Sequence, residues 1–239
     1  MNTPRAKLTA LVVLLGALAA RCAPSIDRDP LDDPTISRSR FNAFRCTTCH
    51  AIGAGDPRIL PGARLDGALA RRSFWGGAIA TARGAVDECF AHFMRGDSLD
   101  REPDAEARLL RRLSELRAVS GALTDTVPFT VVSETAPPTG GDRARGRDLY
   151  DRACGYCHGA PHTGEGRVGA TTSVLPEDTE RSHPSASGYT IETLRHTFVH
   201  KVRLGSFRGF AGTMPPFSRE VLSDEDVVDI VAYLDPTLR

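Results

Sequence analysis

The stretch CTTCH at residues 46–50 decides how this chain is organised, because CGYCH at residues 154–158 repeats it. Two cysteines and a histidine within five residues can hold zinc, exchange disulfides or attach a haem, and one explanation has to serve both copies. The copies start 108 positions apart (154 minus 46) in a chain of 239 residues, which favours two small domains of about 100 residues each. The corresponding residues are Cys46 and Cys154, Cys49 and Cys157, and His50 and His158.

Zinc and disulfide exchange explain the two motifs less well than haem does. A structural zinc site usually closes with a second ligand pair a few tens of residues later, but Cys49 and Cys154 are 105 residues apart (154 minus 49). A thioredoxin-like redox pair would sit in a βαβ setting, and no long strand pattern occurs in either half. Haem attachment uses all five residues, because two cysteines add across two vinyl groups and the adjacent histidine reaches the iron. The sequence therefore predicts two covalently bound haem c groups.

The charge balance and the N-terminus indicate an exported protein that does not bind nucleic acid. Thirty basic and thirty acidic residues leave no basic face for a nucleic acid. Residues 1–22 have the pattern of a secretory signal, since Arg5 and Lys7 precede an uncharged apolar run from Leu8 to Ala20. Those 13 residues are too few to cross a hydrocarbon core of ~30 Å. We expect a periplasmic or otherwise exported protein.

Two ways of processing the signal stay open. Cleavage after Ala19 would use a small residue on either side of Leu18. Cleavage before Cys22 would give a lipoprotein, although Arg21 stands where bacterial lipoprotein signals normally have a small residue. In the second case a lipid on Cys22 would anchor the protein to a membrane.

Residues 36–121 are predicted to form the first domain, built from helices. The segment SRSRFNAFRCTTCH, residues 37–50, is expected to begin with a short helix. A closing helix is expected from Pro103, a residue that suits the first helical position, to Gly121, which can end it. Its apolar stripe consists of Leu109, Leu110, Leu113 and Leu116.

Residues 142–239 are predicted to form the second domain, after an extended linker at residues 122–141. Val127 to Val132 within the linker are expected to press on a domain surface. Asp142 is the expected cap of the opening helix, and the closing helix starts at a capping-box pair and stops at Pro236. The capping-box pair is Ser223 and Asp226.

The mature chain has two methionines, and one follows each haem motif. Met94 lies 44 residues after His50, and Met214 lies 56 residues after His158. Methionine commonly fills gaps in a core, but Met214 stands in the glycine and proline loop AGTMPPFS, where a rigid backbone can aim the side chain inward. We expect the metal ligands to be His50 with Met94 and His158 with Met214.

Taken together, these motifs resemble the class I cytochrome c family, in which an opening helix, a CxxCH motif, a methionine loop and a closing helix enclose one haem. The resemblance covers residues 36–120 and 142–239 and implies an all-α fold of two tandem cytochrome c-like domains. It also implies that a proline carbonyl orients the proximal histidine, a role that falls to Pro61 in the first domain and to Leu175-Pro176 in the second. In the second domain it rests on Gly146, Tyr150, Cys154, Cys157, His158, Met214 and the segment LSDEDVVDIVAYL.

Cys89 and His92 compete with Met94 for the first iron. Met94 lies 19 residues before Leu113 of the closing helix, close to the 20 residues between Met214 and Leu234, whereas Cys89 lies 24 before it and His92 lies 21. In an α-helix, about 100° per residue would place Cys89 and Met94 about 140° apart, so only one of them could face the iron. Gly96 is expected to end this helix.

The function favoured by the sequence is electron transfer between redox-partner proteins through two His/Met-ligated haems, without a catalytic residue. The alternative is a dihaem enzyme of a peroxidase-like or thiosulfate-oxidising kind. Cys89 supports that alternative, because some sulfur-oxidising cytochromes ligate haem through cysteine. A subunit of a membrane respiratory complex is a third possibility.

Overall fold

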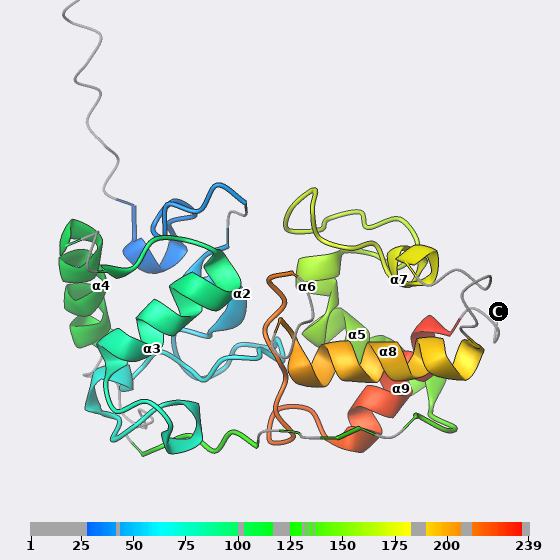
Figure 1. The fold of residues 1–239 in the computed structure, drawn as a ribbon. Coiled ribbons are helices and arrows are strands. Elements are labelled where there is room, and N and C mark those ends of the chain that lie inside the picture. The colour runs from blue at the N-terminus through cyan, green and yellow to red at the C-terminus, as the bar shows by residue number, and fades with distance from the viewer. Residues whose placement is uncertain are drawn as a thin grey trace, which may run out of the picture.

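In the structure, a computed structural model, the helices and turns of the described part of the chain are joined by loops, and its regular elements are helical (Figure 1). That part comprises residues 28–41, 44–99, 103–116, 125–130, 132, 134–135, 137–182, 190–206 and 212–235. The all-α prediction is confirmed, since two isolated bridges are the only β pairing among these residues. None of the described helices has the length and apolarity to span a membrane. The expected signal at residues 1–22, including Cys22, lies outside the described residues.

The first half packs short helices against one longer helix, α4. The cluster of buried side chains that joins them includes Leu31, Phe90, Met94 and Leu109. The elements are η2 (Pro30–Asp32), α2 (Cys46–Cys49), η3 (Ala68–Ala70), η4 (Trp75–Gly77), α3 (Ala82–Cys89), the π-helical turn η5 (Phe90–Met94) and α4 (Pro103–Glu115).

Helix α4 follows its sequence pattern closely. It begins at Pro103 as predicted, and Leu109, Leu113 and Leu116 of the predicted stripe are buried. Leu110 is half-buried at the edge of the stripe. The expected end of the helix at Gly121 lies outside the described residues.

The helix expected ahead of the first CxxCH motif is absent from the described residues there. The chain is non-helical from Arg38 to Phe41, and Phe41 is 71% exposed. Leu31 and Ile36 fill that side of the core instead, from a 3₁₀ turn and a following turn. Ser37 is fixed by its carbonyl, which accepts a hydrogen bond from the Asp97 amide at 2.9 Å. The segment therefore gains its order from tertiary contacts rather than from helix formation.

The second half is built around the packing of α5 against α9. Gly146 makes this contact possible, because a Cβ atom there would lie 2.0 Å from the carbonyl oxygen of Asp229. The predicted caps are confirmed, with Asp142 accepting from the first turn of α5 and Ser223 forming a capping box with Asp226. The elements are α5 (Arg143–Ala153), α6 (Gly155–His158), α7 (Glu177–Ser182), α8 (Ile191–Leu204) and α9 (Asp224–Leu234).

Residues 125–130 of the linker connect the surfaces of both halves. The Thr126 hydroxyl lies 2.6 Å from the Ser73 hydroxyl of the first half. The Thr130 amide donates to the Glu220 carboxylate of the second half at 3.1 Å. In Figure 1 this part of the chain runs from the first half toward the second. The domain boundaries themselves, 36–121 and 142–239, stay predictions.

Candidate functional site

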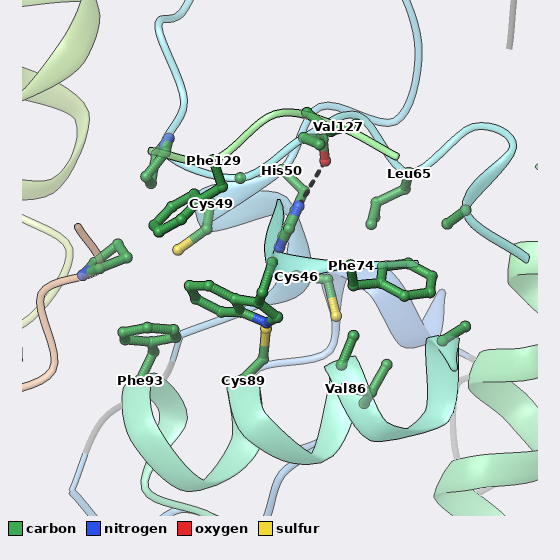
Figure 2. A pocket seen from close by; sticks show the side chains of 18 of the residues that line it. Cys46, Cys49, His50, Leu65, Phe74, Val86, Cys89, Phe93, Val127 and Phe129 are labelled. Atoms are coloured by element: carbon green, nitrogen blue, oxygen red, sulfur yellow. Dashed lines mark hydrogen bonds between the residues drawn. The ribbon is translucent and has the colours of Figure 1, made fainter. Parts of the chain in front are cut away.

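The first CxxCH motif forms one wall of an apolar cavity. Its helix α2 is a single turn, held by hydrogen bonds from the Arg45 amide to the Thr48 hydroxyl at 3.0 Å and from the His50 amide to the Cys46 carbonyl at 2.9 Å. This turn brings Cys46, Cys49 and His50 to the cavity together (Figure 2). Burial raises the pKa of the Cys46 thiol to about 12.

The His50 ring is oriented by a backbone carbonyl and a glycine. Its Nδ1 lies 2.7 Å from the carbonyl oxygen of Ala63 and donates to it, which leaves Nε2 free to bind a metal. A Cβ atom at Gly62 would lie 2.3 Å from Cε1 of this ring, so only glycine allows the ring its place. Burial lowers the pKa of His50 and favours the neutral form that metals bind.

The prediction that the carbonyl of Pro61 orients His50 is therefore wrong, because a different residue supplies that carbonyl. Pro61 is buried and lines the cavity, but the hydrogen-bond acceptor is Ala63, two positions later. The physical reason is the backbone pairing beside the ring. Gly62 donates to the Cys49 carbonyl at 2.9 Å, which turns the next carbonyl, that of Ala63, toward Nδ1.

Helix α3 and the π-helical turn η5 form the wall opposite His50. Figure 2 shows the Cys89 side chain rising from α3 into the cavity, and Phe93 at the next turn. Met94 is 5% exposed and lines the same cavity. Burial raises the pKa of the Cys89 thiol to about 12.

The expectation that Cys89 and Met94 point about 140° apart is wrong, because the helix between them is not α-helical. Residues 90–94 form a π turn, whose i→i+5 hydrogen bonds place residue i+5 about one turn after residue i. Cys89 and Met94, five apart, therefore both reach the cavity. The helix ends at Arg95 in the left-handed conformation (φ 51°), one residue before the predicted Gly96.

His92 lies outside the cavity. It is exposed, and its Nε2 lies 2.9 Å from the Glu88 carboxylate one turn earlier on the helix. Of the three candidates for the position opposite His50, the structure brings Cys89 and Met94 to the site and leaves His92 on the surface.

Aromatic side chains and the second half complete the cavity. The Trp75 ring stacks on Phe93 with centroids 5.8 Å apart and meets Phe129 of the linker edge-on at 5.1 Å. The predicted packing of the linker on a domain surface is thus found at Val127 to Phe129. The second half contributes Pro215, Pro216, Ser218 and Val221.

These residues fit a covalently attached haem. Two thiols for the vinyl groups and a neutral imidazole stand on one wall, and a thiol and a thioether stand on the other. The remaining lining is almost wholly apolar and aromatic, as a porphyrin ring requires. Arg71, which also lines the cavity, supplies a cation suited to an acidic edge of the group.

The second CxxCH motif has the same local design. His158 Nδ1 lies 2.9 Å from the carbonyl oxygen of Ser173, so Ser173 takes the role that was predicted for Leu175-Pro176. Burial lowers the pKa of His158 as it does that of His50. The fully buried Tyr150 donates its hydroxyl proton to the carbonyl of Gly159 at 2.9 Å, which fixes the chain just after the motif.

Met214 is half-buried and packs against the core of the second half. Its loop is fixed by the buried Arg203, which donates to the carbonyls of Phe217 at 3.1 Å and Leu222 at 2.8 Å. The ligand role of Met214 stays a prediction. Sequence reasoning missed Arg203 as the residue that shapes this loop, since a charged residue in a polar-looking helix gives no sign that it is buried.

Sequence reasoning also missed Gly62, Ala63 and Ser173. Gly62 was detectable in principle, because a glycine shortly after a ligand often marks a close approach of the backbone. The two carbonyl acceptors carry no side-chain signal. They are defined by backbone direction alone.

Two comparisons with known proteins agree with this geometry. Residues 141–234 match the family model described as cytochrome C oxidase, cbb3-type, subunit III. A thiosulfate dehydrogenase of Psychrobacter arcticus (strain DSM 17307 / VKM B-2377 / 273-4) is similar to the chain, with 26% identity over 196 residues. That alignment covers 80% of this chain and 55% of the relative, so the chain spans about half the length of that protein.

Proposed function

We propose that this chain, whose residues 141–234 match the family model described as cytochrome C oxidase, cbb3-type, subunit III, is a dihaem oxidoreductase. In this proposal a small sulfur anion of the thiosulfate class gives up electrons at the first site. The second site, with His158 and Met214, passes them to a redox-partner protein. The sequence alone favours a pure carrier, and the first cavity changes that preference.

The single observation that carries the proposal is the Cys89 thiol in the cavity opposite the His50 ring. We propose that Cys89 is the second ligand of the first iron. When bound, the haem supplies an iron that accepts one electron at a time. Because a thiolate is the ligating form, Cys89 has to lose its proton on binding, against a thiol pKa that burial, with the neighbouring Cys46 and Glu88, raises to about 12.

The similarity to a thiosulfate dehydrogenase supports the same assignment. That protein's name states a sulfur-anion substrate, and a closed carrier site with methionine ligation offers no comparable role for a cysteine in the cavity. Arg71 would attract an anion to the first site. Burial lowers the pKa of its guanidinium, which nevertheless stays charged.

A second candidate is the electron carrier with Met94 as the ligand. The observation that favours it is the burial of Met94 beside the same cavity. The π turn that brings both sulfur atoms to the site is the reason why geometry alone leaves two candidates. Membrane respiratory complexes are proposed partners in either case. Export is proposed because c-type cytochromes are extracytoplasmic proteins, and a membrane anchor would depend on lipidation of Cys22.

One set of variants separates the two candidates. Denatured mass spectrometry should first show two haems per chain. Cys89→Ser should then change the spectrum and the potential of one haem and abolish its reduction by thiosulfate, whereas Met94→Leu should leave both properties unchanged. The opposite pattern, with loss of a near-infrared sulfur-to-iron band in Met94→Leu, would establish the carrier.

A further inference from the structure

The two haem attachment motifs lie beside each other, joined by a loop of the first half. This loop, residues 56–59, docks on α5, the helix that leads into the second motif. The Ile59 amide donates to the Arg152 carbonyl at 2.9 Å, and Arg152 Nε donates back to the Pro57 carbonyl at 3.1 Å. The Ile59 side chain packs against the core of the second half. The loop is therefore fixed to both halves.

Arg58, at the centre of this loop, reaches from one motif to the other. Its Nη1 donates to the carbonyl of Thr47, inside CTTCH, at 3.2 Å. Its guanidinium carbon lies 5.7 Å from the ring centre of Tyr156, inside CGYCH, which is within the range of a cation–π contact.

The guanidinium of Arg58 is held in one orientation by a neighbour. Asp56 accepts hydrogen bonds from Nε at 3.0 Å and from Nη2 at 2.6 Å. Such a two-point contact fixes the plane of a guanidinium as well as its position. The guanidinium of Arg58 is thus held in a fixed position between the two motifs.

The second half also borders directly on the first site. The first cavity is also lined by Pro215 and Pro216, which follow Met214 directly. Both ends of the second site therefore border on the first.

We propose that Arg58 is a positioning residue that holds the two attachment motifs in contact, so that electrons pass directly between the two sites. This inference rests on the proposed function, in which both motifs carry haem. In the step, one electron leaves the reduced first site and enters the oxidised second site, with no bond formed or broken and no proton moved. Arg58 is not one of the proposed ligands of either iron, and its effect is on geometry.

The test measures how fast an electron placed on the protein by a light pulse equilibrates between the two haems. Arg58→Ala should slow this equilibration several-fold, and Arg58→Lys, which keeps the charge but loses the planar fork, should restore only part of the rate. Tyr156→Leu should slow it as well, whereas Tyr156→Phe, which keeps the aromatic face, should not. Arg72→Ala, at an exposed arginine of the first half, is the matched control and should leave the rate unchanged.

Haem counts and ligation spectra of every variant keep the two proposals apart. A wild-type chain with one haem overturns the proposed function and this inference together. Two haems with an unchanged internal rate in Arg58→Ala overturn the inference alone. If Arg58→Ala fails to fold or to acquire haem, the equilibration rates of Asp56→Asn and Tyr156→Leu test the proposal in its place. Normal electron equilibration in both of these variants contradicts the proposal.

Discussion

The two CxxCH sites share one wall and differ in the other, and the difference shows what the motif does and does not determine. In both sites the histidine Nδ1 donates to a carbonyl, of Ala63 in one and Ser173 in the other. Opposite His50 stands a helix with a π turn that presents Cys89 and Met94, whereas Met214 comes from a loop fixed by Arg203. In the proposed function, the motif supplies the attachment and the proximal ligand. The opposite wall then distinguishes a site suited to substrate from one suited to electron transfer alone.

The largest effect on this comparison is expected from Gly62→Ala. A Cβ atom there would lie 2.3 Å from the His50 ring and would force it off its carbonyl partner, and overpacking of this kind typically costs about 1–3 kcal/mol. The first haem should lose its normal ligation, while the second keeps its spectrum. Visible and near-infrared spectra of the purified variant measure this.

Gly53→Ala is the matched control for that variant. A Cβ atom at Gly53 meets nothing within 4 Å, so both haem spectra should stay as in the wild type. An unchanged first haem in Gly62→Ala would show that the ring has room to move. The shared proximal wall would then not be the rigid element of the comparison.

A smaller effect, confined to the second site, is expected from Arg203→Met. Arg203 donates hydrogen bonds to the carbonyls of Phe217 and Leu222, and the substitution removes this donor. The loss should lower the free energy of unfolding by about 2 kcal/mol. We expect a lower urea midpoint and a weaker methionine band from the second haem. The first haem should keep its ligation.

Arg203 also forms an ion pair with Asp224 at 2.7 Å. Arg219→Ala serves as the control for Arg203→Met, because Arg219 is exposed and pairs with the same Asp224 at 3.1 Å. Exposed ion pairs contribute about 0–1 kcal/mol to stability, so the urea midpoint of Arg219→Ala should barely change. Equal losses in both variants would mean that the ion pair with Asp224, rather than the two carbonyls, stabilises the loop.

The parts of the structure that sequence predicted are those determined by local rules. The cap at Asp142, the capping box at Ser223 and the start of α4 at Pro103 follow from residue type and spacing within one helical turn. Cys46, Cys49 and His50 also meet at one cavity, because five consecutive residues carry the whole pattern, while the haem-binding roles of both motifs stay predictions.

The parts that sequence did not predict depend on contacts between distant segments. Among the described residues before Cys46, a segment tied to Asp97 stands in place of the expected helix, and the π turn at Phe90–Met94 brings Cys89 and Met94 to one cavity. Helical periodicity assumes a regular α-helix and fails at such a turn. The bridge from Arg58 to Tyr156 joins two halves whose relative placement no local pattern encodes.

The smallest effect concerns the linker over the first site and is expected at low pH. Hydrogen bonds from the side chain and amide of Thr130 lower the pKa of Glu220 to about 2, against an ordinary value of 4.5. A group with a lowered pKa stabilises the folded protein above its ordinary pKa, and that contribution is lost as the pH falls from about 4.5 toward 2.

The fluorescence of Trp75, the single tryptophan, measures this loss. Because Phe129 of the same segment contacts Trp75, the Trp75 fluorescence should change over that pH range. Glu220→Gln should show the change already at neutral pH, and Glu192→Gln, at an exposed glutamate of α8, should not. A Glu220→Gln protein with wild-type fluorescence at every pH would mean that the linker is fixed by the contacts of Phe129 with the first half, and that the contact between Thr130 and Glu220 plays no part in closing the first site.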